Sequence, residues 1–220
     1  MRNINSTTAL STSRLFLVIL SMLLALTAGC AEKGPILIEG ITYQTPEGAA
    51  AGKGNTVAAV STFRDLREVQ PSVIGKRQIG NDISNDLVVQ GTAADMVTGM
   101  IREALKVRGI EARSAAAWDL SDASINAEGA DILVGGEIKA LRVEVISQPF
   151  KVRYKAMVQL RVSAADVKER KVLRTLNLSS SLEQENVSYS DYIVQEMLSE
   201  ALSSSINQLL SDEEIKNRIR

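Results

Sequence analysis

The chain of 220 residues contains no histidine and a single cysteine, Cys30. Without histidine it lacks the most common general acid or base and the most common metal ligand in proteins. One cysteine can form neither an intramolecular disulfide nor a cysteine-based zinc site. A histidine-dependent hydrolase triad is therefore excluded, and no S-x-x-K motif offers a serine–lysine alternative. We expect a protein that is not an enzyme.

Aromatic residues and an excess of one charge are also scarce. Aromatic side chains make up 4% of the chain, and 25 basic residues stand against 26 acidic ones, for a formal charge of −1. No strongly basic patch stands out, so nucleic acid is not an expected partner. Asp65, Asp82 and Asp86 do not have the spacing of a calcium loop. We interpret them as acids of solvated loops and expect no metal site.

The first 29 residues have the layout of an export signal. Arg2 and Arg14 precede an apolar run over residues 15–26, which is shorter than the roughly 20 residues that cross a bilayer. Residues 27–29 are small, as a signal peptidase requires. The pattern predicts that residues 1–29 are removed. The alternative is an ordinary signal peptide or an anchor helix followed by an incidental cysteine.

The five residues Leu26-Thr27-Ala28-Gly29-Cys30 resemble the bacterial lipobox. The resemblance implies cleavage between Gly29 and Cys30, diacylglycerol on the thiol and an acyl chain on the new amine, with no other cofactor. Several acyl chains would give a stable anchor. The more usual lipobox has Leu where Thr27 stands. Ala31 follows Cys30 in place of Asp, and by resemblance to enterobacterial sorting this implies the outer membrane rather than the inner one.

The mature part has the length of one domain. Residues 30–35 are predicted to be a lipidated tether, and residues 36–220 a single periplasm-facing domain. Hydrophobic periodicity predicts the elements of that domain. Strands are expected over 36–44, 56–63, 110–113, 130–147, 150–164 and 172–187, and helices over 92–108 and 190–210, with a short helix at the end.

This order predicts an α+β fold, a curved and mostly antiparallel sheet with two long helices packed on one face. The polar stretch 68–91 is interpreted as a long loop, with a short strand within 83–90 as an option. Gly135 and Gly136 are candidates for a bulge or bend in the strand that contains them.

Residues 150–164 alternate almost perfectly between apolar and polar side chains. The polar side is basic, and two interpretations remain open for it. It is either the solvent-exposed face of a sheet that is covered on its other face only, or a surface for an anionic partner such as a lipid head group, lipopolysaccharide or an acidic protein. The basic residues are Lys151, Arg153, Lys155 and Arg161.

Several short motifs follow the lipobox in a characteristic order. They are Asp65-x-Arg67, Ile74-Gly75, Arg108-Gly109-Ile110 and the strand from Ala130 to Val134. This order resembles the YajG-type family of proteobacterial lipoproteins over most of residues 36–215. The resemblance implies an envelope lipoprotein with no established enzymatic activity, and it supplies no catalytic residues. The Gly-rich stretch 47–54 and the length of 68–91 are not matched.

Two functions follow from these observations. The first is a non-enzymatic, membrane-anchored lipoprotein that acts as a binding or scaffolding module, with an envelope protein or a glycolipid as partner. The alternative is a lipid- or lipopolysaccharide-handling accessory lipoprotein of a transport or assembly complex. An open apolar groove between the two long helices favours the alternative, whereas a closed core favours the first.

Overall fold

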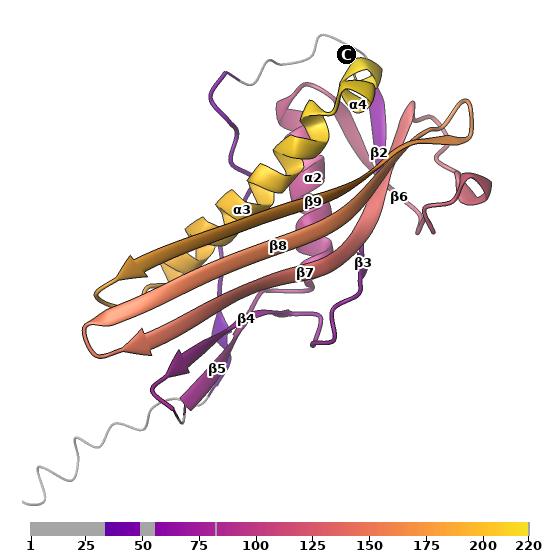
Figure 1. Ribbon diagram of the computed structural model, residues 1–220. Helices are drawn as coiled ribbons and strands as arrows, with labels where there is room; N and C mark the ends of the chain where they lie inside the picture. Colours follow the sequence, from indigo (N-terminus) through magenta and orange to yellow (C-terminus); the bar gives the residue numbers. More distant parts are fainter. Residues whose placement is uncertain (1–33, 49–55, 82, 220) are drawn as a thin grey trace, which may run out of the picture. The chain divides into compact units, whose positions relative to one another are not determined.

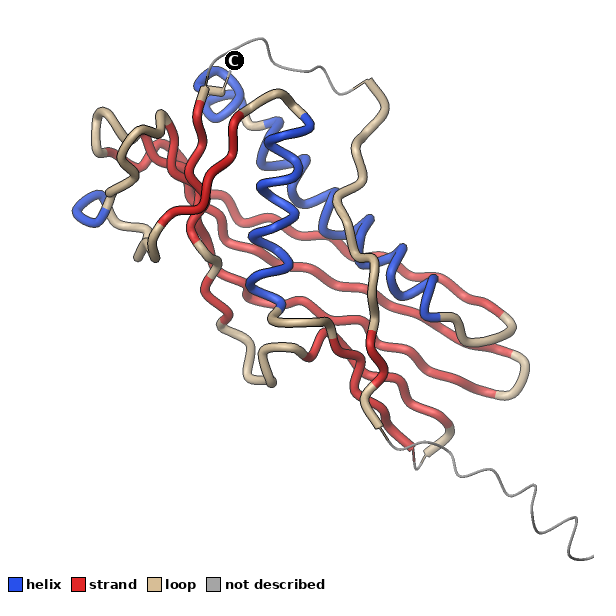
Figure 2. Tube along the Cα trace, turned by 180° about the vertical axis from the view of Figure 1, so that it is seen from behind, coloured by secondary structure: helices blue, strands red, loops and turns tan. Residues whose placement is uncertain are grey.

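The computed structural model describes residues 34–48, 56–81 and 83–219. The predicted signal peptide and the predicted lipidation at Cys30 lie outside these residues. The chain from Gly34 onward forms one compact unit. In this unit a curved sheet carries helices α2 (Ala93–Val107) and α3 (Asp191–Ser211) on one face, as Figures 1 and 2 show from opposite sides.

One half of the sheet is a long antiparallel meander, as the sequence predicts. Its strands are β7 (Ile132–Gln148), β8 (Lys151–Asp166) and β9 (Lys171–Asn186). The β7–β8 hairpin turns at residues 149–150, and we call this end of the sheet the Phe150 end. At the other end Ile132 pairs with Asp166, and we call it the Asp166 end.

The other edge of β7 is lined in parallel by three short strands that follow one another along it. They are β2 (Val57–Ser61), β3 (Arg64–Asp65) and β4 (Val73–Ile79). Three outer strands complete the sheet: β6 (Glu111–Ala115) parallel to β2, β5 (Ile83–Val88) antiparallel to β4, and β1 (Ile36–Leu37) parallel to β5. The sheet is therefore mixed, and the prediction of a mostly antiparallel sheet is wrong for this half.

The predicted loop 68–91 is largely a β-hairpin. β4 and β5 pair with each other, and β4 also pairs with β7. Gly75 allows this, because a Cβ built there would lie 2.1 Å from the backbone oxygen of Val143. The predicted strand 36–44 is also shorter than expected, since only Ile36–Leu37 pairs within the sheet.

The helices begin where their caps predict. The Thr92 hydroxyl accepts a hydrogen bond from the Asp95 amide at 3.0 Å and donates to the Asp95 carboxylate at 2.7 Å, a reciprocal capping arrangement. Ser190 occupies the N-cap position of α3, but its side chain makes no capping bond there. A short helix, α4 (Glu213–Arg218), follows α3 and is capped by Asp212.

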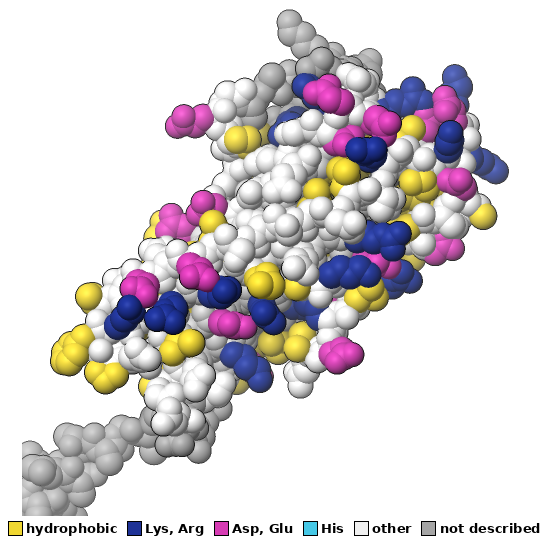
Figure 3. Space-filling view, in the orientation of Figure 1, with side chains coloured by type: hydrophobic (Ala, Val, Ile, Leu, Met, Phe, Trp, Pro, Cys, Tyr) yellow, Lys and Arg dark blue, Asp and Glu magenta, His cyan; other side chains and the backbone are white. Residues whose placement is uncertain are grey.

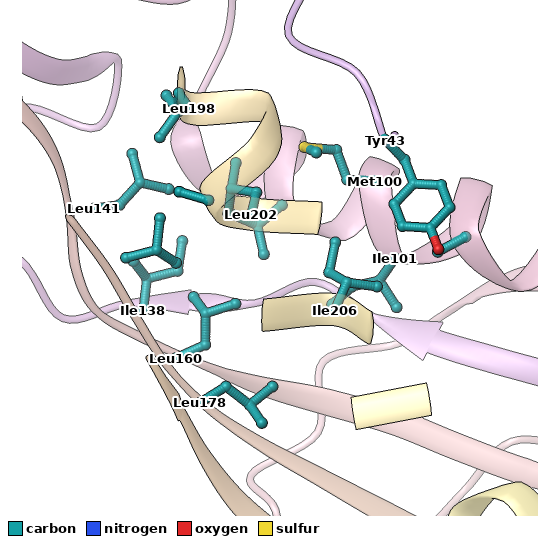
Figure 4. Packing of buried hydrophobic residues seen from close by; sticks show 14 of the residues in the cluster. Tyr43, Met100, Ile101, Ile138, Leu141, Leu160, Leu178, Leu198, Leu202 and Ile206 are labelled. Atoms are coloured by element: carbon teal, nitrogen blue, oxygen red, sulfur yellow. The ribbon is translucent and has the colours of Figure 1, made fainter. Parts of the chain in front are cut away.

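The main core lies between the helices and the sheet. Apolar side chains of α3 and α2 face those of β7, β8 and β9 across it, as Figure 4 shows. The alternation of residues 150–164 is confirmed, because Val152, Tyr154, Ala156, Val158, Leu160 and Val162 are all at most 3% exposed. This core is held together by the packing of apolar side chains.

A second, smaller cluster lies on the other face of the sheet, at the Asp166 end only. The segment after β6, with the 3-10 helix η1 (Asp122–Ser124), covers this part of the face. Its members are Trp118, Ile125 and Ala127 packed on Ala59, Leu133 and Ala165. The sequence did not predict this cover, and it divides the sheet into a doubly covered end and a half-open end.

Candidate functional site

The sheet has an open face, which is the side of β7, β8 and β9 turned away from α2 and α3. Figure 3 shows this face with cationic and acidic side chains intermixed. The four predicted basic residues of β8 lie on it. The side chains of Lys151, Arg153, Lys155 and Arg161 are between 41% and 55% exposed.

Three of the four cations pair with carboxylates of the neighbouring strand β9. Lys151 and Arg153 both lie beside Glu185, with N–O distances of 2.8 and 3.4 Å. Lys155 lies 2.8 Å from a carboxylate oxygen of Glu183. The hydrogen bonds from Lys151 and Lys155 hold the pKa of Glu185 and of Glu183 below the usual range. This row is therefore a cross-strand ladder of ion pairs, in which two carboxylates balance two of the three cations.

Arg161 belongs to a different group, at the middle of the open face. It lies across β7 from Arg64 of β3, and both cations approach Glu137, which is only 4% exposed. Lys139 adds a third cation at 2.7 Å from Glu137. Hydrogen bonds from Lys139 and Arg64 lower the pKa of Glu137 despite its burial. We call Arg64, Lys139 and Arg161 with Glu137 the cation cluster.

The cation cluster has more positive than negative charge, because three cations surround one carboxylate. Arg64 also acts electrostatically on Asp119, whose pKa is lowered to about 2, first by hydrogen bonds from Ser124 and Ser121. Sequence reasoning identified only Arg161 of this cluster. The register of residues 172–187 was unclear, and the parallel pairing of β3 with β7 that brings Arg64 to Glu137 leaves no local pattern.

The Asp65-x-Arg67 motif forms a clamp rather than a catalytic pair. The Arg67 guanidinium donates to both carboxylate oxygens of Asp65 at 2.7 and 2.8 Å, and it also donates to the carbonyls of Val73 and Leu141. Burial raises the pKa of Asp65, but the hydrogen bonds from Arg67 outweigh it and the pKa is lowered. The Arg67 side chain is 6% exposed. The motif therefore ties the segment before β4 to the middle of β7.

Residues 38–46, which we call the strap, leave the sheet after β1 and cross α3 in extended form, as Figure 2 shows. Their backbone amides find partners on the helix: those of Thr42 and Gln44 donate to the hydroxyls of Ser199 and Ser203 at 3.2 and 2.8 Å. These serines are four residues apart and so lie on one side of the helix. Ser199 and Ser203 begin a polar stripe on α3. Their hydroxyls accept the hydrogen bonds of the strap that the carbonyls of a neighbouring strand would otherwise accept.

Tyr43 of the strap reaches both long helices. Its amide donates to Glu103 of α2 at 3.4 Å, its hydroxyl donates to Asn207 of α3 at 2.6 Å, and the residue is 6% exposed. Figure 4 shows its ring beside Met100, Ile101 and Ile206. The strap therefore fills the space between the helices on their outer side.

Beyond Gln44 the polar stripe of α3 continues along an open groove of about 550 Å³. The groove is lined mainly by hydroxyl and amide side chains, among them Ser203, Asn207 and Ser211. Across residues 34–48, 56–81 and 83–219, no group of three or more Asp, Glu, His or Cys side chains is arranged to hold a metal ion. None of the helices in this part of the chain is both long and apolar enough to cross a membrane.

No family model matches the chain, and no curated protein is significantly similar to it in sequence. Several solved structures are similar. A Xanthomonas campestris protein of the DUF330 family has a TM-score of 0.53 at 13% identity, covering 84% of this chain and 95% of its own. A putative neuraminyllactose-binding hemagglutinin homolog from Helicobacter pylori has a TM-score of 0.47 at 10% identity, covering 82% and 97%. A Neisseria meningitidis lipoprotein has 0.37 at 13%, covering 71% and 99%. The Xanthomonas protein shares the fold.

Proposed function

We propose that the chain is a lipid-anchored protein of the bacterial outer membrane, facing the periplasm, whose domain acts as a binding or scaffolding module without enzymatic activity. One observation carries the proposal. The only cysteine of the chain ends a lipobox-like sequence and stands four residues before Gly34, where the compact unit begins. Cys30 is accordingly proposed as the lipidated residue, with Gly29 on the other side of the cleaved bond.

The packing of the domain supports binding at a surface. The core between sheet and helices is filled by apolar side chains, and the strap occupies the outer space between α2 and α3. A ligand that needed an acyl-chain cavity would have to displace the strap. The relationship to YajG-type lipoproteins stays a prediction.

The open face is the proposed contact surface, and the cation cluster is its centre. An anionic partner was one of the two interpretations for the basic residues of β8, but Glu183 and Glu185 balance two of the three charges of Lys151, Arg153 and Lys155. Around Glu137 the cations exceed the carboxylates. An anionic group of a protein or a glycolipid is therefore expected to bind nearer Arg161 than Lys151.

Site-specific photo-crosslinking in living cells tests this proposal. A photoreactive amino acid at Gln159, which is exposed on the open face of β8, is expected to capture a defined envelope partner. The same amino acid at Lys168, in the exposed turn after β8, is the matched control and should capture little. Cys30→Ala should abolish both membrane attachment and the crosslink. A crosslink that persists unchanged in Cys30→Ala would contradict an anchored module.

Paired substitutions then locate the contact on the open face. Arg161→Gln should weaken the Gln159 crosslink severalfold, because it removes one cation of the surplus. Arg153→Gln removes an arginine of the same strand that shares Glu185 with Lys151 and lies eight residues from Arg161, and it should weaken the crosslink much less. If Arg153→Gln had the larger effect, the contact surface would be the ion-pair ladder and the proposed centre would be wrong.

The lipid-handling alternative is favoured by one feature, the polar attachment of the strap. The strap is held on α3 largely by serine hydroxyls and amide groups, so its displacement would expose polar groups that water can satisfy. Under this alternative, Ser199→Ala with Ser203→Ala should increase the lipid that copurifies with the protein. Under the binding-module proposal the same double variant should change protein stability but not bound lipid, as mass spectrometry of the purified protein would show.

A further inference from the structure

Exposed apolar side chains gather at the Phe150 end of the domain. Phe150 is 93% exposed in the turn between β7 and β8, Val187 is 76% exposed after β9, and Tyr192 is 63% exposed at the start of α3. Ile146, near the end of β7, adds a fourth at 38%. Elsewhere in the described residues, exposed large apolar side chains are Leu37, Leu66, Val69 and Val107, all below 50%.

Phe150 is also unusual in its backbone conformation. Its φ is +62°, in the left-handed region that disfavours bulky side chains. Glycine would satisfy this turn without strain. The turn therefore carries a large, solvent-exposed aromatic ring at a position where the fold alone would favour a smaller residue. Neither packing nor turn geometry accounts for Phe150.

The chain from the predicted anchor reaches the domain at the same end. The Gly34 carbonyl accepts a hydrogen bond from the Asn85 side chain at 2.8 Å, and Asn85 lies two residues from the start of β5. That start pairs with Ile79 of β4, which in turn pairs with Ser147 of β7, next to the Phe150 turn. Gly34 therefore lies at the Phe150 end of the sheet.

The short chain between Cys30 and Gly34 places the Phe150 end near the membrane if Cys30 is lipidated. Cys30 precedes Gly34 by four residues, which can span at most about 14 Å at about 3.6 Å per residue. β8 has 16 residues, so the Asp166 end lies about 50 Å from the Phe150 end at about 3.3 Å per residue. An anchor at Cys30 therefore brings the Phe150 end to the lipid surface and leaves the Asp166 end away from it.

The cations near the Phe150 end contribute less to membrane attraction than their number suggests. Lys151 and Arg153 share Glu185, and the Arg77 guanidinium lies 3.7 Å from the centre of the Tyr189 ring. These cations are already engaged by groups of the domain itself. Because these cations still outnumber Glu185, anionic lipid should strengthen the contact somewhat, but the apolar side chains would be its main driving force.

We infer that the Phe150 end docks on the lipid surface that holds Cys30, with Phe150 and Val187 inserted at the interface. The inference deepens the proposed function and rests on lipidation of Cys30. A small apolar contact binds weakly by itself, but beside a covalent anchor it acts intramolecularly. The contact therefore orients the domain rather than anchoring it, and it points the Asp166 end into the periplasm.

The test uses the lipidated protein, purified from membranes and reconstituted in phosphatidylcholine vesicles with and without brominated acyl chains. The chain has one tryptophan, Trp118, which is 8% exposed and lies in the cluster at the Asp166 end. Its emission should be unaffected by bromine. In Phe150→Trp the added emission should lose more than half its intensity. Val107→Trp, at an exposed position after which the chain joins β6, is the matched control and should not be quenched.

A second variant separates docking from folding. Phe150→Gly should keep or raise the unfolding midpoint, because glycine suits a φ of +62°. Placed with Val187→Trp, it should reduce bromine quenching at position 187 severalfold relative to Val187→Trp alone. A lower midpoint with unchanged quenching would contradict the inference.

The outcomes distinguish the inference from the function on which it rests. Intact-mass measurement first reports whether Cys30 carries lipid, and its absence would overturn the proposed anchor. If the Phe150→Trp variant is lipidated and vesicle-bound but its added tryptophan is not quenched, docking is overturned and the anchor stands. A blue shift of that added emission without bromine quenching, together with crosslinked dimers, would overturn docking by assigning the Phe150 end to contact with a second copy of the chain.

Discussion

The two ends of the β7–β8 hairpin use the same strands in different ways. Near the Phe150 end, buried and exposed residues of β8 alternate, because helices cover one face and water the other. At the Asp166 end residues 162–166 are all buried, since α3 and α4 lie on one side and the Trp118 cluster on the other. The side chains there are short, with Ser163, Ala164 and Ala165 in succession. Alternation in the sequence thus marks the open part of the sheet, and a run of small residues marks double coverage.

The largest loss of stability is expected at the Asp65–Arg67 clamp, which contacts β7 between the two ends. Arg67→Ala leaves the Asp65 carboxylate and two backbone carbonyls without their donor, and we expect a loss of about 3–5 kcal/mol in the free energy of unfolding. Urea denaturation measures it. Arg142→Ala removes a cation of the open face whose side chain is 54% exposed, and it should cost no more than about 1 kcal/mol. Similar losses for the two variants would contradict the clamp.

The next prediction compares the two ends directly on one face of β7. Leu133 is 1% exposed in the Trp118 cluster, and Ile146 is 38% exposed near the Phe150 end. Leu133→Ala should therefore cost about 2–5 kcal/mol in unfolding free energy. Ile146→Ala should stay within about 0.5 kcal/mol of the wild type. Equal costs in urea denaturation would show that the face is covered equally at both ends.

A third prediction uses one substitution at two glycines and expects opposite signs. In Gly136→Ala the new Cβ would lie 2.5 Å from both the Arg161 carbonyl oxygen and the Phe63 ring, so we expect a loss of about 1–3 kcal/mol. In Gly99→Ala, within α2, no atom lies within 4 Å of the new Cβ, and stability should rise by about 0.5–1 kcal/mol. Thermal unfolding of both variants would measure the contrast, and a fall in both midpoints would refute it.

The smallest effect concerns pH and the cation cluster. The pKa of Glu137 is lowered in the folded state, so its stabilising contribution is full above its unfolded pKa and is lost as the pH falls through the lower folded value. Wild type and Glu137→Gln should therefore differ in stability at neutral pH and converge in acid. Urea midpoints measured from neutral pH downward would show this. A constant difference across that range would argue against an ionised Glu137 paired with its cations.

The sequence predicted those parts of the fold whose signals are local. The alternation of 150–164 and the Thr92 cap each lie within a few residues, and both are confirmed. β4 was missed because Lys76, Arg77 and Gln78 interrupt any apolar pattern, and its partner β7 is far away in the chain. The strap was taken for a strand because its extended backbone is real, but its partners are the serines of a helix.

The candidate site was predictable only in part, for the same reason. The basic residues of β8 stand out in one strand, whereas the ion pairs that three of them form depend on the register of β9. Glu183 and Glu185 alternate in the sequence and were the available signal. The partners of Arg161 come from β3 and β7, and no periodicity connects Arg64 with Glu137.

The parallel line of β2, β3 and β4 along β7 sets an order of events during folding. These strands precede β7 in the chain, so during synthesis they emerge before the strand that pairs with them. Residues 132–211, in contrast, hold a meander and a helix that pack on each other and are contiguous. Low sequence separation favours rapid formation of such a unit. Until this unit forms, β2, β3 and β4 lack their shared partner β7, although β2 can pair with β6 and β4 with β5. The edges of these strands that face β7 are therefore the part of the chain most open to mispairing during folding.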